Sequence, residues 1–369
     1  MNKLNQITVS LLILIILLGF VIGTVILNFG QVYANSSNQT QSTHRVFLPI
    51  ITNPPPRQVL LGVYTDHWLG FQSTIDNEIT AIGTWSGKRI SIAGIFIGFE
   101  DPDLDKNIPN VLGRVWDSGY TPLVNMESIR TLAYINSGNL DHAIRLVARS
   151  YKKWRDDGLA IGQNRKAFFA PLQEMNGDWV PYYGTPADYK RVYQRIYNIF
   201  VQEGAASAVR WVFAPNGWSY AHDNFEYFYP GDEFVDVIAF SSYNFGYCPA
   251  VTAKSWTTPE RAFGAYIQRM RAMAPSKPIF VIQTASSAWD ASGFNTAAKN
   301  EWLRNAYNYL ADSPGVAGII YFNMENNQIC DFAFYLPEGR KYDGYRQGVS
   351  RKEYVYLSPA ELVEMELIP

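Results

Sequence analysis

Two residues, each at the end of an apolar run, are the first candidates for chemistry. One run ends at Glu174, which is closely followed by Asn176 and Trp179, and a second run, 278–282, delivers Gln283. A carboxylic acid beside an aromatic ring is typical of sugar sites, because sugars offer both hydroxyls and flat apolar faces. Retaining hydrolysis of a glycosidic bond needs two carboxyl groups, one to protonate the leaving oxygen and one to attack the anomeric carbon. The sequence shows one carboxyl group and one amide.

The elements that position these residues follow a repeating pattern. Eight short apolar runs alternate with segments of helical periodicity. Because the runs are apolar throughout, both faces of each strand should be covered, as in a parallel sheet with helical crossovers. We predict an α/β fold, a (β/α)8 TIM barrel, with strands at 59–65, 91–99, 121–128, 166–174, 209–216, 235–244, 278–284 and 316–323. The alternative is an open doubly wound sheet, but segment 61–65 lacks the glycine-rich phosphate loop typical of that class.

The carboxyl ends of the predicted strands are strongly polar. In a TIM barrel the functional side chains lie at these ends. Carboxylates and amides are interleaved there with tryptophan and tyrosine: Asp66, Glu100, Glu127, Gln173, Glu174, Asn216, Tyr243, Gln283, Asn323 and Glu325, with Trp68, Trp179, Trp218, Tyr220 and Trp289. This mixture favours a carbohydrate site.

Segment 171–179, Pro-Leu-Gln-Glu-Met-Asn-Gly-Asp-Trp, resembles the acid/base signature of glycoside hydrolase family 26, the β-mannanase family of clan A barrels. Weaker similarities are Ser-Tyr-Asn at 242–244, Lys-Pro-Ile at 277–279 and Tyr-Phe-Asn at 321–323. The resemblance covers nearly all of residues 58 to 335. It implies a β-mannanase-type hydrolase acting on β-linked polysaccharide, mannan or mixed β-glucan, with no cofactor.

The resemblance also implies roles for individual residues. Glu174 takes the place of the acid/base, and Gln283 takes the place of the nucleophile. Sugar contacts are predicted for residues at the strand ends, namely Gln173, Asn176, Trp179, Trp218, Tyr243, Trp289 and Asn323.

Two positions depart from the family pattern. Gln173 stands where the family usually has histidine, and Gln283 stands where active members have glutamate. An amide is a poor nucleophile, so the covalent glycosyl intermediate cannot form through Gln283 in the usual way. We therefore expect impaired or altered hydrolysis, with a catalytically inactive carbohydrate-binding pseudoenzyme as the alternative.

Two other mechanisms would allow hydrolysis without a nucleophile at position 283. Glu127 or Glu325 could serve as a substitute carboxylate in an inverting arrangement, although a supporting acid is the more ordinary role for each. Substrate-assisted hydrolysis of an amino sugar, with Gln283 bonded to the acetamido group, ranks last.

The amino-terminal segment has the composition of an export signal. Residues 1–34 carry an apolar run that fits either a cleaved signal peptide or an uncleaved membrane anchor. Residues 35–57 are polar and end in three prolines, which predicts a linker to the single domain 58–369. The domain is thus expected outside the cell, secreted or anchored to the outer face of the membrane. The tail after Leu336 is expected to be a surface extension.

The remaining composition excludes several classes of protein. A net charge of −2 without a basic patch argues against nucleic-acid binding. Two cysteines and four scattered histidines predict no metal site. Whether Cys248 and Cys330 form a disulfide or are two unrelated buried thiols stays open at this stage.

Overall fold

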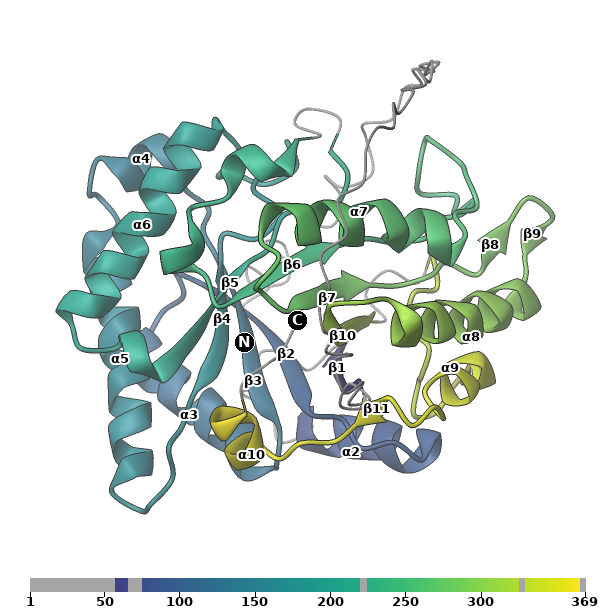
Figure 1. Ribbon diagram of the computed structural model, residues 1–369, viewed down its shortest axis with the longest axis horizontal. Coiled ribbons are helices and arrows are strands. Elements are labelled where there is room, and N and C mark those ends of the chain that lie inside the picture. Colours follow the sequence, from purple (N-terminus) through teal and green to yellow (C-terminus); the bar gives the residue numbers. More distant parts are fainter. Residues whose placement is uncertain (1–56, 66–74, 220–223, 325–328, 366–369) are drawn as a thin grey trace, which may run out of the picture.

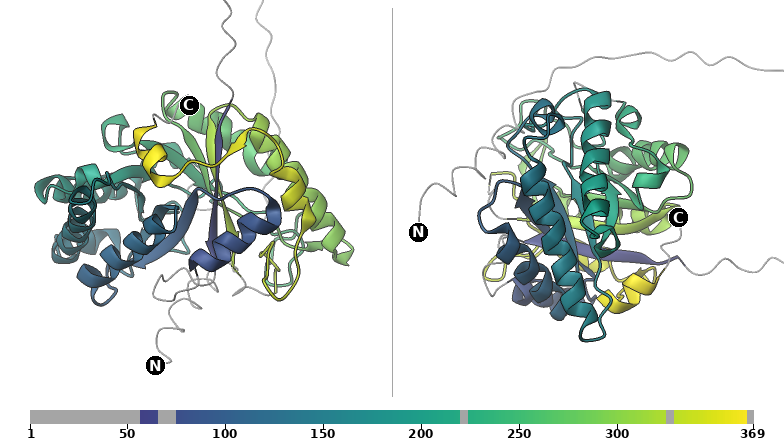
Figure 2. Two further views of the ribbon diagram at one scale, coloured as in Figure 1. Left: turned by 90° about the horizontal axis from the view of Figure 1, so that it is seen from below. Right: turned by 90° about the vertical axis from the view of Figure 1, so that its left-hand side faces the viewer.

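The computed structural model describes residues 57–65, 75–219, 224–324 and 329–365. The predicted amino-terminal segments, 1–34 and 35–57, lie outside these residues except for position 57. Figures 1 and 2 show a central ring of strands with helices on its outside.

Eight parallel strands among the described residues close into a barrel. In chain order they are β1 (Val59–Thr65), β2 (Ile92–Gly98), β3 (Thr121–Glu127), β4 (Ala167–Pro171), β5 (Val209–Phe213), β6 (Val237–Ser241), β7 (Ile279–Thr284) and β10 (Val316–Asn323). Neighbouring strands pair in this order, and β10 pairs with β1 to complete the ring. The TIM barrel prediction is confirmed, although β4, β5 and β6 are shorter than the predicted runs.

Helices connect the strands and form the outer layer (Figure 1). They are α2 (Ile75–Ser86), α3 (Leu104–Asp117), α4 (Leu132–Asn136), α5 (Asp141–Leu159), α6 (Pro186–Gln202), α7 (Pro259–Met273) and α8 (Thr296–Asp312). The start of α6 shows how the sequence sets a boundary: the side chain of Thr185 accepts a hydrogen bond from the Asp188 amide, and Pro186 occupies the first turn. A short hairpin, β8 (Trp289–Asp290) and β9 (Gly293–Phe294), follows β7.

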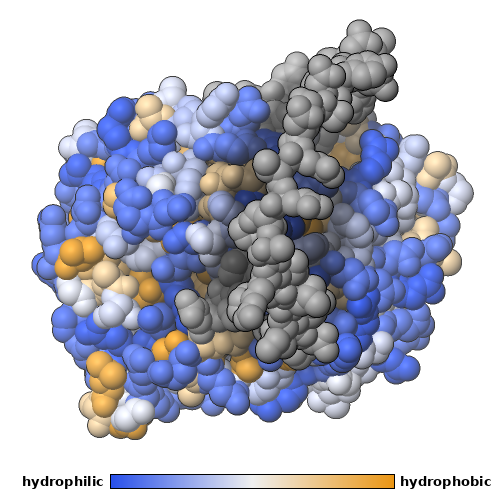
Figure 3. Space-filling view, viewed as in Figure 1, coloured by the Kyte–Doolittle hydropathy of each residue, from blue (hydrophilic) through white to orange (hydrophobic). Residues whose placement is uncertain are grey.

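Apolar side chains form two buried layers. One layer lies between the strands and the outer helices, and the other fills the barrel interior with residues such as Leu60, Phe168 and Phe280. The face of the molecule seen in Figure 3 is mostly hydrophilic, with apolar residues in small separate groups. Most large apolar side chains of the described residues therefore lie in the core, which supports the site.

The carboxyl-terminal segment belongs to the core, so the expectation of a surface extension after Leu336 is wrong. It contains α9 (Asp343–Gly348), β11 (Tyr354–Val355) and α10 (Pro359–Glu364), and β11 pairs with β1. Leu362 of α10 packs into the barrel interior. Arg210 donates to the backbone oxygens of Leu362, Val363 and Met365, which holds α10 in place.

Candidate active site

The backbone after β4 turns sharply and presents Glu174 at the barrel mouth. Leu172 and Glu174 have φ values of 53° and 58°, a left-handed conformation that is rare outside glycine. Two amide hydrogen bonds hold it: Leu172 donates to the Met126 oxygen at 2.8 Å, and Glu174 donates to the Ala214 oxygen at 2.7 Å. Backbone strain of this kind persists where the surroundings enforce it, often at functional sites.

Both carboxylate oxygens of Glu174 accept hydrogen bonds. The Trp179 Nε1 donates to Oε2 at 2.8 Å, and the Asn216 Nδ2 donates to Oε1 at 3.0 Å. Burial raises the pKa of Glu174, while interactions with Ser241, Trp179 and Asn216 lower it. The net direction is upward, as a proton donor requires, although the three polar neighbours favour the charged form.

Asn176 positions these groups and has no exposed surface for a sugar. Its side chain is fully buried, its Nδ2 donates to the Asn216 oxygen at 2.9 Å, and its Oδ1 accepts from the Asn216 amide at 2.9 Å. The predicted sugar contact for Asn176 is therefore corrected to a supporting role. Asn176 holds Asn216 in place, and Asn216 in turn holds the carboxylate.

Gly177 makes room for the indole of Trp179. A Cβ added at Gly177 would lie 2.3 Å from two carbons of that ring. Trp179 is partly exposed while its Nε1 is bonded to Glu174, so its ring is available to stack on a sugar.

Gly177→Ala is expected to displace Trp179, break its bond to Glu174 and weaken glycan affinity about tenfold, the equivalent of about 1.4 kcal/mol. Isothermal titration calorimetry with oligosaccharides measures the change. Gly113→Ala is the matched control, because a Cβ at Gly113 would meet no atom within 4 Å. Equal affinity of the Gly177→Ala variant and the wild type would show that Trp179 does not contact the ligand.

Gln283 lies close to Glu174 on the same rim of the barrel. Asn216, Ser241 and Gln283 form consecutive cross-strand pairs at the ends of β5, β6 and β7. Glu174 interacts with the first two of these residues. The side chain of Gln283 is 5% exposed, and its Oε1 accepts a hydrogen bond from the Tyr243 hydroxyl at 2.9 Å. Tyr243 thus contacts the residue at the nucleophile position, as the resemblance implies.

We expect the pKa of Glu174 to be lower in the wild type than in a Gln283→Glu variant. A second carboxylate so close would disfavour ionisation of Glu174, whereas the neutral amide does not. NMR titration of the Glu174 carboxyl carbon in both proteins measures the difference. Identical titration curves would contradict the proximity of the two side chains.

Glu127, at the end of β3, is the one of the two candidate substitute carboxylates that lies within the described residues. Gln173 Nε2 donates to Glu127 Oε1 at 2.7 Å, while Gln173 Oε1 is buried without a partner among the described residues. Burial raises the pKa of Glu127 to about 7, opposed by the Gln173 hydrogen bond and reinforced by the charges of Glu174 and Asp101. The two glutamates therefore share one electrostatic environment.

Glu127→Gln is expected to stabilise the protein at pH 8 but not at pH 4. The folded-state pKa of Glu127 is about 7 and its ordinary value is 4.5, so the unfolded chain binds fewer protons between these values. Stability contributed by this group therefore falls as pH rises from 4.5 to 7. The gain at pH 8 is on the order of 2 kcal/mol, since one pKa unit is about 1.4 kcal/mol and the side chain keeps some exposure. Urea unfolding at both pH values measures it, and an equal effect at the two would contradict the raised pKa.

The remaining predicted contacts lie on different parts of the rim. Trp218 follows β5, is partly exposed, and its backbone amide donates to Asn216 Oδ1. Among the described residues, the amide group of Asn323 forms hydrogen bonds only with the backbone of Phe334 and Tyr335, so its predicted sugar contact is also corrected to a supporting role. Glu325, the other candidate carboxylate, lies outside the described residues.

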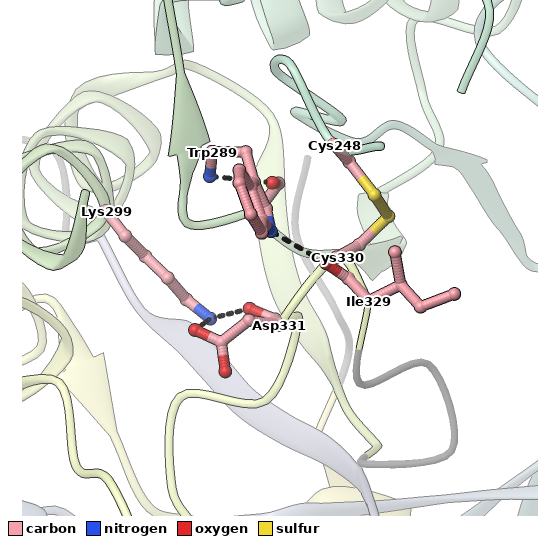
Figure 4. The surroundings of a disulfide bond; sticks show 7 residues. Cys248, Trp289, Lys299, Ile329, Cys330 and Asp331 are labelled. Carbon is pink, nitrogen blue, oxygen red and sulfur yellow. Dashed lines mark hydrogen bonds and ion pairs between the residues drawn. A yellow bond between two sulfur atoms is a disulfide. The ribbon is translucent and has the colours of Figure 1, made fainter. Parts of the chain in front are cut away.

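Trp289 packs beside a disulfide bond between Cys248 and Cys330 (Figure 4). Its Nε1 donates to the Ile329 oxygen at 2.7 Å, and its backbone oxygen accepts from the Tyr247 amide at 2.8 Å. The indole is partly exposed and stacks edge-on against Phe294. The disulfide ties the segment after β10 to the segment after β6, and this resolves the alternative that the sequence left open.

Sequence reasoning missed three residues beneath the carboxylates. Asn125 Nδ2 donates to the Tyr64 hydroxyl at 2.7 Å inside the barrel. Burial raises the pKa of Tyr64, and the charges of Glu174 and Glu127 add to this shift. Ser241 interacts with Glu174 from the end of β6. Tyr64 and Asn125 sit within apolar runs, so only their polarity at an inward strand position could have indicated them.

Among the described residues, no cluster of histidine, cysteine, aspartate or glutamate has the arrangement of a metal site. The described helices also include none with the length and apolarity to cross a membrane. The predicted leader at 1–34 lies outside the described residues.

Comparison with known proteins agrees with this geometry. Residues 106–259 match the model of glycosyl hydrolase family 26, a range that contains Glu127 and Glu174 and ends before Gln283. Over these residues the chain is similar to glycosyl hydrolase family 26. It is 26% identical over 284 residues to Endoglucanase H of Acetivibrio thermocellus, covering 72% of this chain and 28% of that protein. It is 25% identical over 281 residues to a mannan endo-1,4-beta-mannosidase of Bacillus subtilis, covering 65% of this chain and 74% of that protein.

Solved structures show the same fold at lower identity. A modular endo-β-1,4-mannanase from Cellulomonas fimi superposes with a TM-score of 0.59 at 18% identity, covering 82% of this chain and 74% of that one. A Bacillus subtilis mannanase superposes with a TM-score of 0.55 at 16% identity, covering 83% and 88%. The barrel of this chain therefore has the same fold as these two mannanases.

Proposed function

We propose that this chain is a secreted or surface-anchored family 26 glycoside hydrolase that binds β-linked polysaccharide and hydrolyses it poorly. The observation that carries the proposal is the pairing of Glu174, held by Trp179 and Asn216, with the amide of Gln283 on the same rim. The related mannan endo-1,4-beta-mannosidase and Endoglucanase H suggest mannan or mixed β-glucan as the polysaccharide.

The electrostatics of the site support slow retaining hydrolysis. An oxocarbenium-like centre is stabilised by a carboxylate beneath it, and Gln283 offers a neutral amide there. Removal of one preorganised oxyanion-hole donor costs about 3–4 kcal/mol, so the loss of a full charge should slow the reaction at least about a thousandfold. A binding protein without turnover is the second candidate, favoured by the same amide together with the aromatic rings of Trp179 and Trp218.

One panel of measurements tests the proposal. Binding to mannan, mixed-linkage β-glucan and chitin oligosaccharides is measured by affinity electrophoresis, and reducing-sugar release is measured on the same substrates. We expect binding to mannan or β-glucan with little release, and no release at all would favour the binding protein. Mannan hydrolysis that survives Glu174→Ala would contradict the role of Glu174, and binding of none of these glycans would overturn the proposal.

A further inference from the structure

The two facing positions of the site, Glu174 and Gln283, differ in charge. Both oxygens of Glu174 accept hydrogen bonds, from Trp179 Nε1 and from Asn216 Nδ2. These donors favour the anionic carboxylate, while burial raises its pKa and so makes the anion a stronger base. An anionic Glu174 can accept a proton from a hydroxyl that attacks a sugar carbon. Glu174 therefore fits the role of general base as well as that of acid.

Gln283 supplies a hydrogen-bond donor at the opposite station. Its amide oxygen is occupied by the Tyr243 hydroxyl, and its Nε2 has no hydrogen-bond partner among the described residues. An amide nitrogen can only donate, so Nε2 suits an atom that gains negative charge. In a retaining site this station lies on the face of the sugar ring opposite the acid/base.

We propose that the chain transfers a glycosyl unit from an α-configured donor, whose leaving group departs without protonation, to a hydroxyl of a β-glycan. The inference rests on the proposed function only in using the same glycan site for the acceptor. α-Glycosyl phosphates are the class of donor that meets these requirements, because phosphate leaves as an anion and carries acceptor oxygens.

The step balances in atoms and charge. The acceptor hydroxyl gives its proton to the Glu174 carboxylate, and its oxygen forms a bond to the anomeric carbon. The bond from that carbon to the leaving group breaks, and the departing anion takes the electron pair and accepts a hydrogen bond from Gln283 Nε2. One displacement inverts the anomeric carbon, so an α-donor gives a β-linked product. This product accumulates because the site has no carboxylate at position 283 to attack it.

α-Mannosyl fluoride, α-glucosyl fluoride and the two α-1-phosphates test the inference, with β-1,4-linked manno- and gluco-oligosaccharides as acceptors. Fluoride or phosphate release is measured with and without acceptor, and the product linkage is determined by NMR. We expect acceptor-dependent release at least tenfold above the reaction without protein. Glu174→Gln should reduce it about a hundredfold or more, as for loss of a general base. Glu301→Gln, a surface carboxylate with 67% of its side chain exposed, should leave it unchanged.

Each other outcome overturns the inference. The inference is wrong if release does not depend on Glu174, if the product is α-linked, or if there is no release above background. The melting temperature of the Glu174→Gln variant shows whether that variant is folded. If oligosaccharides still bind while no donor reacts, the transfer is wrong and the proposed function stands. If the chain neither binds glycans nor uses any donor, both are wrong.

Discussion

Replacing Gln283 by glutamate is expected to raise hydrolysis of mannan or mixed β-glucan at least about a thousandfold. The new carboxylate would occupy the end of β7, one cross-strand pair from Ser241, which interacts with Glu174. The Tyr243 hydroxyl, which now donates to the amide oxygen, would donate to the carboxylate instead. The substitution changes little volume, so the gain would come from the nucleophile and its charge.

Initial rates of reducing-sugar release from both polysaccharides measure the effect. Gln283→Ala is the matched control, because it also removes the amide but supplies no carboxylate and should stay inactive. The double variant Gln283→Glu with Glu174→Gln should lose the gained activity, since the leaving oxygen would then lack its proton donor. If Gln283→Glu stays inactive while it still binds glycans, the interpretation of position 283 as the nucleophile station is wrong.

The barrel was predictable because its strands are buried on both faces. Each run is apolar along its whole length, as in β1, and this pattern distinguishes a parallel strand from a half-exposed one. Strand ends were less predictable. Residues 172–174 were predicted as part of the fourth strand, but the chain leaves the sheet after Pro171. The left-handed backbone of Leu172 and Glu174 depends on hydrogen bonds to residues that are distant in the sequence, which the local pattern does not show.

The carboxyl-terminal segment shows a second limit. Its buried residues, Tyr345, Tyr354 and Leu362, are separated by charged and glycine residues without a helical or strand period. Their burial comes from packing against α8, β1 and the barrel interior, which no local pattern encodes.

The candidate site was predictable in position and less so in individual roles. The positions of the predicted strand ends indicated that Glu174, Gln283 and Tyr243 lie close together, and the structure places these side chains on one rim of the barrel. The same reasoning assigned sugar contacts to Asn176 and Asn323. The sequence alone does not distinguish an amide side chain that faces a ligand from one that bonds to the backbone of a neighbouring loop. Only the hydrogen-bond partners distinguish the two roles.

Lys299→Met is expected to reduce the free energy of unfolding by about 3 kcal/mol, because it leaves the charge of a buried carboxylate less well compensated. Lys299 is fully buried on α8, and its Nζ lies 3.6 Å from Asp331 Oδ2 (Figure 4). Nζ also donates to the backbone oxygens of Asp331 and Ala333. Burial lowers the pKa of Lys299 to about 7, with Asp331 opposing the shift, so the amine is charged in the folded protein at pH 6. Urea unfolding at that pH measures the loss.

The double variant Lys299→Met with Asp331→Asn separates charge from packing. It removes both charges, so it should be more stable than Lys299→Met alone, and the difference gives the coupling of the pair. The same segment reaches the site, because the ring of Phe332 lies 5.8 Å from that of Tyr243, which bonds to Gln283. Lys299→Met should therefore also weaken glycan binding, although Lys299 is remote from the carboxylates in sequence and fully buried. A loss of stability below 1 kcal/mol, or an equally large loss in the double variant, would show that the ion pair does not hold this segment.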